Sequence, residues 1–88
     1  MLDNYRRKVF MQQIEFHLKR EFVQLNQLLK LTGLCDSGGA GKALVAAGDV
    51  LVDGSVELRK TCKIRVGQIV RFGDVQIGIV AAEETPPA

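Results

Sequence analysis

The stretch that decides the fold is Thr32-Gly33-Leu34-Cys35-Asp36-Ser37-Gly38-Gly39-Ala40-Gly41-Lys42-Ala43, which continues to Gly48-Asp49-Val50-Leu51-Val52-Asp53-Gly54. A glycine followed by a leucine is typical of a helix that ends in a left-handed residue, so we predict a helix C-terminus at Gly33. Asp36 or Ser37 then supplies a side-chain oxygen that can cap a second helix. Small residues make one face of this helix, and Gly48 ends it. The stretch therefore predicts a helix, a tight loop and a second short helix.

Upstream of this stretch, the spacing of apolar residues changes twice. Gln13–Lys19 alternates apolar and polar side chains, which predicts a half-buried strand. From Glu21 to Thr32 the apolar residues recur at helical spacing, with Phe22 on the apolar face, so we predict the first helix there.

Downstream, short apolar runs alternate with turn signals. Val50–Val52 leads into Asp53-Gly54, a strong two-residue hairpin signal, and Gly73-Asp74 suits a type II′ turn. The predicted strands after the first turn are Ser55–Leu58, Lys63–Val66, Ile69–Phe72 and Val75–Val80. We therefore expect an α+β fold, with two short packed helices against a small, mostly antiparallel sheet.

Length and composition set the domain organisation. The 88 residues, 47% hydrophobic and 25% charged, are typical of one globular domain. We expect this domain at residues 13–81, preceded by a leader at 1–12 that is either frayed or a short helix. The acidic, proline-containing residues 82–88 are predicted to be a disordered tail.

Several classes of function are disfavoured. No apolar run is long enough for a membrane span and no signal peptide is present, so we expect a cytoplasmic protein without a membrane partner. Cys35 and Cys62 lie in no metal-binding or CxxC spacing and are expected to be reduced, and His17 has no spaced partner. A small core leaves little room for a deep substrate cavity. We expect no catalytic residues, no metal and no cofactor.

The glycine-rich loop resembles two nucleotide motifs but satisfies neither. A P-loop needs glycine at position 36 and serine or threonine at 43, where this chain has Asp36 and Ala43. A GxGxxG motif that begins at Gly39 would need glycine where Leu44 stands. Two interpretations remain open. The loop is either a structural turn, or a helix N-terminus whose backbone N–H groups, with Lys42 nearby, accept a phosphate without catalysis.

Basic residues gather after the hairpin. Five cations and no acid lie between Leu58 and Gly73, namely Arg59, Lys60, Lys63, Arg65 and Arg71. Strand alternation places Ile64 and Val66 on one side, and Lys63 and Arg65 together on the other, solvent side. Such a face is either simply solvated or binds phosphates, and the lack of local counter-charge favours binding. Phe72 is the only aromatic residue there, so the pattern indicates recognition of RNA shape and backbone rather than base stacking.

A longer pattern resembles a known family. The pattern is Leu25-x-x-Leu28-Leu29-Lys30-x-x-Gly33-Leu34-x-x-Ser37-Gly38-Gly39-x-x-Lys42-Ala43-Leu44-x-x-x-Gly48-x-Val50-x-Val52-Asp53-Gly54-x-Val56-Glu57-x-Arg59-x-x-x-Lys63-Ile64-x-x-Gly67-x-x-Val70. It resembles the S-four-type RNA-binding domain, the αL module named for small-subunit ribosomal protein four, and more closely its small stand-alone bacterial members. The match covers residues 21–72, and many spaced positions agree at once.

The resemblance implies a module that grips structured RNA, known also as an appendage of pseudouridine synthases, tyrosyl-tRNA synthetases and heat-shock ribosome factors. Carried over by position, the RNA-facing residues are Lys30, Ser37, Gly38, Gly39 and Lys42 at the helix–loop–helix, and Arg59, Lys60, Lys63 and Arg65 after the hairpin; the basic run adds Arg71. Many family members have a basic residue directly after the loop serine, where this chain has Gly38-Gly39, and Lys42 is the substitute we expect.

The expected function is therefore non-catalytic binding of structured RNA by a monomer. A ribosomal RNA, a ribosomal precursor and a tRNA-like RNA all remain open as partners, with a role in ribosome assembly or RNA metabolism. The alternative is a protein-docking adaptor on a ribosome-assembly or RNA-processing partner. An enzymatic role remains only as a detached targeting module that acts in trans. Salt dependence separates the first two, because phosphate contacts weaken steeply with salt and an apolar patch does not.

Overall fold

The computed structural model describes residues 12–82 of the chain. The predicted leader lies outside this range except for Gln12, and the predicted tail lies outside it except for Ala82. Along the described chain the elements are β1 (Gln12–Leu18), β2 (Val23–Gln24), α1 (Leu25–Leu31), α2 (Gly38–Ala46), β3 (Val50–Val52), β4 (Ser55–Val56), β5 (Lys63–Ile64), β6 (Ile69–Phe72) and β7 (Val75–Ala81).

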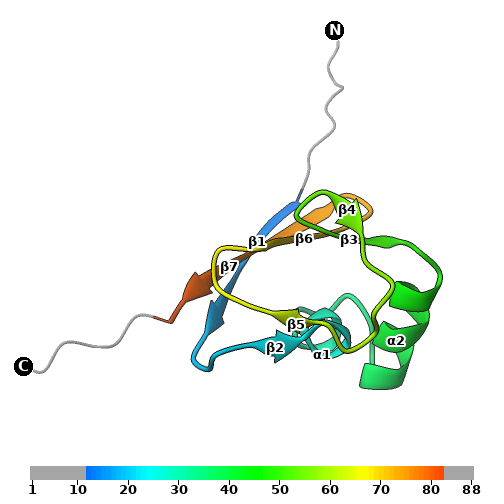
Figure 1. Ribbon diagram of the computed structural model, residues 1–88, viewed down its shortest axis with the longest axis horizontal. Helices are drawn as coiled ribbons and strands as arrows, with labels where there is room; N and C mark the ends of the chain where they lie inside the picture. Colours follow the sequence, from blue (N-terminus) through cyan, green and yellow to red (C-terminus); the bar gives the residue numbers. More distant parts are fainter. Residues whose placement is uncertain (1–11, 83–88) are drawn as a thin grey trace, which may run out of the picture.

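A five-stranded sheet forms one layer of the molecule (Figure 1), with the strand order β1-β7-β6-β3-β4. Its neighbours pair antiparallel except β1 and β7, which run parallel over their full length, from Gln12 opposite Val75 to Leu18 opposite Ala81. A separate two-stranded sheet joins β2 to β5 on the side of α1. The expected α+β fold, with two helices and a mostly antiparallel sheet, is confirmed.

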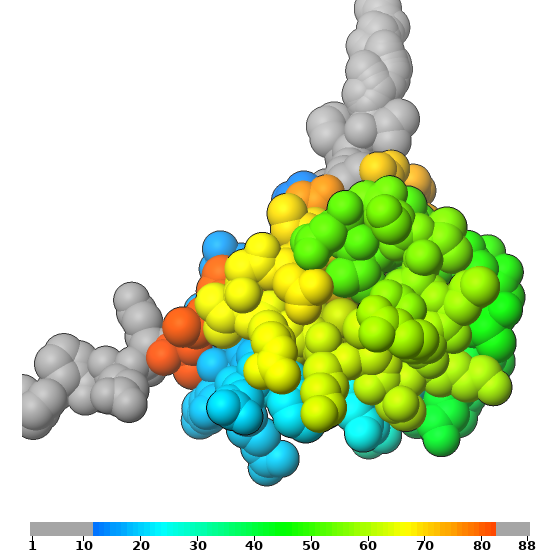
Figure 2. Space-filling model, viewed as in Figure 1, coloured from blue at the N-terminus to red at the C-terminus, as the bar shows by residue number. Residues whose placement is uncertain are grey.

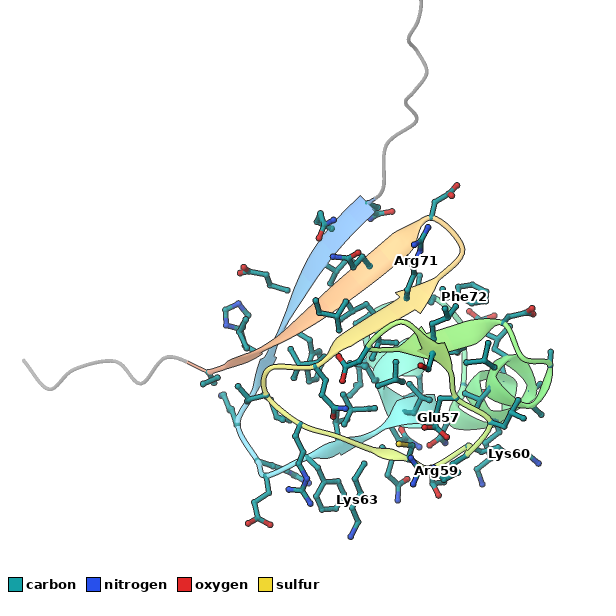
Figure 3. All side chains as sticks on the ribbon, turned by 45° about the horizontal axis from the view of Figure 1, so that its top comes forward. Glu57, Arg59, Lys60, Lys63, Arg71 and Phe72 are labelled. Carbon is teal, nitrogen blue, oxygen red and sulfur yellow. The ribbon has the colours of Figure 1, made fainter. Side chains whose placement is uncertain are left out.

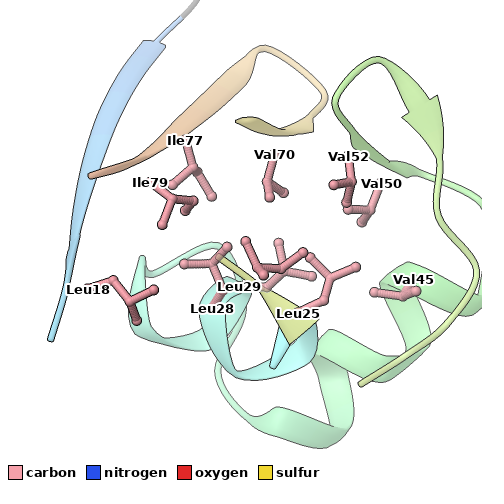
Figure 4. Close-up of a cluster of buried hydrophobic side chains, with 11 residues drawn as sticks. Leu18, Leu25, Leu28, Leu29, Val45, Val50, Val52, Val70, Ile77 and Ile79 are labelled. Atoms are coloured by element: carbon pink, nitrogen blue, oxygen red, sulfur yellow. The ribbon is translucent and has the colours of Figure 1, made fainter. Parts of the chain in front are cut away.

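The core lies between the large sheet and the two helices (Figure 4). Aliphatic side chains of β3, β6 and β7 point toward those of α1 and α2, and the largest fully buried ones include Leu25, Leu28, Val45, Val70 and Ile77. Burying each such side chain stabilises the fold by about 1.5–3 kcal/mol. The predicted apolar stripe of the first helix therefore packs against the sheet.

Helix α1 is shorter than the predicted Glu21–Thr32. Its first predicted turn is instead extended, because Val23–Gln24 pairs with Lys63–Ile64. The backbone N–H groups of Leu25 and Asn26 then donate to the carbonyl oxygens of Cys62 and Lys60, at 2.8 and 3.1 Å. These bonds satisfy donors that a helix N-terminus leaves unpaired. The helix begins where a distant segment caps it.

The ends of both helices at the loop are as predicted. Leu34 N–H donates to Leu29 O and Gly33 N–H donates to Lys30 O, both at 3.0 Å, and Gly33 has a φ of 83°. This pair of bonds is the Schellman ending expected from the glycine–leucine pair. Ser37, rather than Asp36, caps α2, because its Oγ accepts from Ala40 N–H at 3.0 Å.

The strands after the first hairpin are shorter than predicted. Strand β4 ends at Val56 instead of Leu58, and β5 ends at Ile64 instead of Val66. Ile64 is fully buried whereas Val66 is 49% exposed, so the prediction that they share a buried side is wrong. The reason is that β2 offers only two residues to pair with, after which the chain turns at Gly67.

The remaining strand predictions hold within a residue. Strand β1 is shifted by one from the predicted Gln13–Lys19, β3 and β6 have the predicted bounds, and β7 extends one residue further than expected. Asp53 and Gly54 both have positive φ, 51° and 87°, as a type I′ hairpin turn requires. Across residues 12–82, no helix is long and apolar enough to cross a membrane.

Candidate nucleic-acid interface

Asn26 joins the start of α2 to the segment that carries the basic residues. It is 2% exposed, and besides its backbone bond to Lys60 O its Nδ2 donates to Gly38 O at 3.3 Å. A Cβ added at Gly41 would overlap the carbonyl oxygen of Asn26, so the two helices touch backbone to backbone at that point. The loop Ser37-Gly38-Gly39 is therefore fixed beside the segment around Lys60.

Four cations make up what we call the basic face: Arg59, Lys60, Lys63 and Arg65. All four are exposed. The segment that carries them covers the molecule's surface between α2 and the start of α1 (Figure 2), and Figure 3 shows Arg59, Lys60 and Lys63 at the same side of the molecule. The structure thus brings together the residues that the basic run and the αL pattern both indicated.

Lys63 and Arg65 converge on one aromatic ring. Lys63 Nζ lies 4.9 Å and Arg65 Cζ 5.7 Å from the centroid of Phe22, and Arg65 Nη1 donates to Glu21 O at 3.5 Å. Cations within about 6 Å of a ring centroid are attracted by its π-electrons. Phe22, which sequence reasoning placed in the helical core stripe, instead precedes β2 and holds both cations in place.

Arg59 has a counter-charge that the sequence argument missed. Its Nε and Nη2 donate to the two carboxylate oxygens of Glu57 at 2.8 and 2.9 Å, and its backbone N–H donates to the same carboxylate at 2.9 Å. These bonds lower the pKa of Glu57 to about 2 and raise the pKa of Arg59. Glu57 lies one position before the acid-free run, so the inference that the whole run lacks counter-charge is wrong for Arg59.

The ion pair also orients the arginine. A bidentate carboxylate fixes the plane of the guanidinium and leaves its remaining N–H donors directed to other partners. Glu57, Arg59 and Lys63 line a surface groove of about 450 Å³, together with Cys62 and Gln68. Burial raises the pKa of the Cys62 thiol, and both Cys62 and Cys35 are free and half-buried. The groove therefore carries donors rather than a reactive thiolate.

The other predicted site residues occupy different places. The hydroxyl oxygen of Ser37 accepts the hydrogen bond that caps α2. Lys30 is exposed in the last turn of α1, one turn after Asn26, and Lys42 is exposed one turn after Gly38. Arg71 lies on β6 near Phe72, well apart from Arg59, Lys60 and Lys63 (Figure 3), and its Nε donates to Gly73 O at 3.5 Å. The structure does not bring Arg71 to the basic face.

A metal centre finds no support in the described part of the chain, where no three His, Cys, Asp or Glu side chains cluster. His17 lies on the exposed side of β1, with its Nε2 3.9 Å from Glu15.

Two further cations, Lys19 and Arg20, follow β1 and line a pocket with Phe16 and Phe22. Sequence reasoning did not select them, although two adjacent cations beside an aromatic residue are a visible signal.

A helix–loop–helix packed on a mostly antiparallel sheet, with cations beside the second helix's N-terminus, defines the class: it is an αL-type α+β domain. The model of the S4 domain family matches residues 16–80. The chain belongs to the S4 domain family, which confirms the resemblance seen in the sequence.

Two curated relatives are both called YbcJ. The protein of Escherichia coli (strain K12), whose name gives RNA binding as a candidate function, is 48% identical over 63 residues, which are 72% of this chain and 90% of that protein. The Shigella flexneri protein, whose name states no function, matches with the same values. These matches bear out the closer resemblance to small bacterial members.

The fold also matches a solved structure. The solution structure of YbcJ from E. coli, reported to reveal an αL motif involved in RNA binding, superposes with a TM-score of 0.59 at 40% identity. The match covers 90% of this chain and 99% of that chain.

Proposed function

We propose that this protein is a non-catalytic RNA-binding protein that holds structured RNA by its backbone phosphates on the basic face. The observation that carries the proposal is the pair Lys63 and Arg65, two exposed cations held over Phe22. The candidate RNA-binding function of the E. coli relative and the αL motif of its solution structure support it. A ribosomal or tRNA-like RNA, met in the cytoplasm by a monomer during ribosome assembly or RNA metabolism, is the partner we infer.

The geometry suits phosphates for a physical reason. Lys63 and Arg65 hold their charges at fixed places without a carboxylate partner among the salt bridges of the described residues, so each is free to neutralise a phosphate. Arg59 adds oriented N–H donors, and the backbone N–H groups at the start of α2 favour an anion. Release of condensed counterions then contributes to binding and makes it depend on salt.

The test is the double variant K63A/R65A in a gel shift with total cellular RNA. We expect binding to weaken strongly, and the slope of the logarithm of affinity against the logarithm of salt concentration to fall by roughly 2, since roughly 1 is lost for each phosphate contact. Circular dichroism must show an intact fold. A double variant that binds as well as the parent would mean that the basic face is only solvated.

A protein-docking adaptor is the second candidate, and one observation favours it. Val56 and Leu58 are 55% and 60% exposed beside Glu57 and Arg59. Exposed apolar side chains are common singly, but these two flank the carboxylate that orients Arg59, a combination typical of protein interfaces. Binding of such a partner would depend weakly on salt and would be lost in V56S/L58S, whereas RNA binding would keep its salt slope in that variant.

A further inference from the structure

A pocket of about 560 Å³ lies where β1 ends and α1 begins. Two half-buried aromatic rings, Phe16 and Phe22, line it together with Leu31, which is 58% exposed. The polar lining includes the amides of Gln24 and Gln27 and the exposed cations Lys19 and Arg20. None of the described residues that line it is acidic.

We propose that this pocket takes one unpaired nucleobase of the RNA held by the basic face, an inference that rests on the proposed function. Protein pockets of roughly 300–1,000 Å³ bind small planar ligands through aromatic lining and a few polar groups. RNA-binding proteins recognise unpaired bases by stacking them on aromatic rings and bonding their edges. Phe16 and Phe22 supply the rings, and Gln24 and Gln27 supply both donors and acceptors.

The pocket is continuous with the basic face through Phe22. The same ring that lines the pocket lies 4.9 Å from Lys63 Nζ and 5.7 Å from Arg65 Cζ. A phosphate on Lys63 or Arg65 therefore places its own nucleotide at the mouth of the pocket. Lys19 and Arg20, which also line the pocket, are available to the next phosphate, so the charges of the lining match a polyanion that carries an extruded base.

The sequence pattern alone argued against stacking, because it placed a single aromatic residue, Phe72, within the basic run. Phe16 lies 56 and Phe22 lies 50 positions before Phe72 in the sequence, and they come from β1 and the turn into β2, respectively.

 The pairing of β2 with β5 brings Phe22 to the basic face, and Phe16 lines the same pocket as Phe22. A second binding mode, base stacking, therefore becomes available to a surface that the sequence predicted to read backbone alone.

The test compares a blunt RNA duplex with the same duplex carrying one bulged 2-aminopurine. We expect the parent protein to bind the bulged duplex roughly tenfold more tightly and to quench the 2-aminopurine fluorescence, since stacking on an aromatic ring accounts for that scale of preference. The variant F16L, which keeps apolar bulk, should lose the preference and the quenching while it binds the blunt duplex as the parent does. The variant F22L should also lose the preference and the quenching, and its binding of the blunt duplex should weaken as well, because Phe22 also holds Lys63 and Arg65.

The matched control is F72L, because Phe72 is also half-buried but lies away from Lys63 (Figure 3). It should keep both the preference and the quenching. If F22L weakens both duplexes equally and F16L changes neither, Phe22 acts only through the cations and the base pocket is refuted.

Two further outcomes separate this inference from the proposed function. If K63A/R65A weakens both duplexes while F16L and F22L keep the tenfold preference, the RNA-binding face stands and the base pocket falls. If K63A/R65A weakens neither, the proposed function itself falls. Quenching that develops only after deletion of residues 83–88, which follow Ala82 beside Leu18, would assign the pocket to the chain's own tail and overturn the inference.

Discussion

Glu57 shows how one carboxylate shapes a cationic surface. Its side chain is 16% exposed, and its bonds to Arg59 hold its pKa at about 2, below the ordinary 4.5. A carboxylate whose pKa is lower in the folded state stabilises the fold at pH values above the ordinary pKa, and this stabilisation is lost as the pH falls through the folded value. The contribution of Glu57 is therefore complete above about pH 4.5 and disappears toward about pH 2.

The variant E57Q tests this linkage. We expect it to be less stable than the parent near neutral pH, with a difference in the free energy of unfolding that narrows as the pH falls from about 4.5 to about 2. Urea denaturation at a series of pH values measures the difference. In an R59Q background the same change should have a much smaller effect, because the partner is gone. A difference that stays constant across this pH range would contradict the linkage.

The burial of Asn26 is a feature of a single residue that the sequence alone does not reveal. In the described part of the chain its Oδ1 is buried without a hydrogen-bond partner, which costs about 1–3 kcal/mol. Its backbone N–H and Nδ2, however, tie Lys60 and Gly38 to the same point. On a helical projection Asn26 is an ordinary polar residue beside Leu25, and only the arrival of two distant segments shows that it is buried.

Helix α2 packs on α1 through a glycine, and a matched pair of substitutions tests this contact. A Cβ at Gly41 would overlap the carbonyl oxygen of Asn26, whereas a Cβ at Gly39 would meet only Ser37 Oγ at 3.9 Å. We expect G41A to destabilise the fold by about 1–3 kcal/mol through overpacking. We expect G39A to stabilise it by about 0.4–1 kcal/mol, since alanine has less backbone freedom to lose on folding.

Thermal and chemical denaturation of both variants measure these effects. Because both changes are glycine to alanine within the first turns of one helix, the helix propensity of alanine favours both equally. The difference between them therefore reports the contact with Asn26. If the two variants are equally stable, α1 and α2 can move apart without loss of stability. That result would contradict the close approach of Gly41 to the backbone of Asn26.

Elements whose signals are local could be predicted from the sequence. The helix endings at Gly33 and Gly48 and the turn at Asp53-Gly54 depend on residues that are neighbours in the chain, and all three are present. The start of α1 could not be predicted, because Val23–Gln24 becomes a strand only when Lys63–Ile64 lies beside it. Helical periodicity carries no information about such a partner.

The candidate site could likewise be predicted from the sequence only in part. The prediction that Lys63 and Arg65 are both exposed is correct, although only Lys63 lies in β5. The bidentate pair of Glu57 with Arg59 was missed because charges were counted in a window that began one residue too late. Phe22 was missed because a residue assigned to a helix stripe was taken for core, whereas its position is set by β2.

At the scale of the whole molecule, Arg71 provides an internal control for where RNA lies. It is an exposed cation of the same basic run, but the fold places it on β6, apart from the basic face (Figure 3). We expect R71A to keep an affinity for RNA close to that of the parent, whereas K63A lowers it, because Lys63 belongs to the basic face and Arg71 does not (Figure 3). Titration of both single variants with the same RNA at one salt concentration measures the comparison.

Each of these variants removes one exposed positive charge, so a general effect of net charge is the same in both. If R71A binds RNA as weakly as K63A does, then either the RNA also contacts the sheet at Arg71, or binding depends on the total charge alone. The salt slopes distinguish these two cases, since a lost phosphate contact lowers the slope by roughly 1.

The parallel pairing of β1 with β7 has a consequence for synthesis of the protein. The strand nearest the start of the described chain finds its partner 63 positions later, from Gln12 opposite Val75 to Leu18 opposite Ala81. Contacts of such high sequence separation are slow to form, and domains emerge from the ribosome N-terminal end first. While translation continues, α1, α2 and the β3–β6 pairing can assemble, but β1 keeps an unpaired edge. Completion of the sheet therefore waits until nearly the last described residue has left the ribosome.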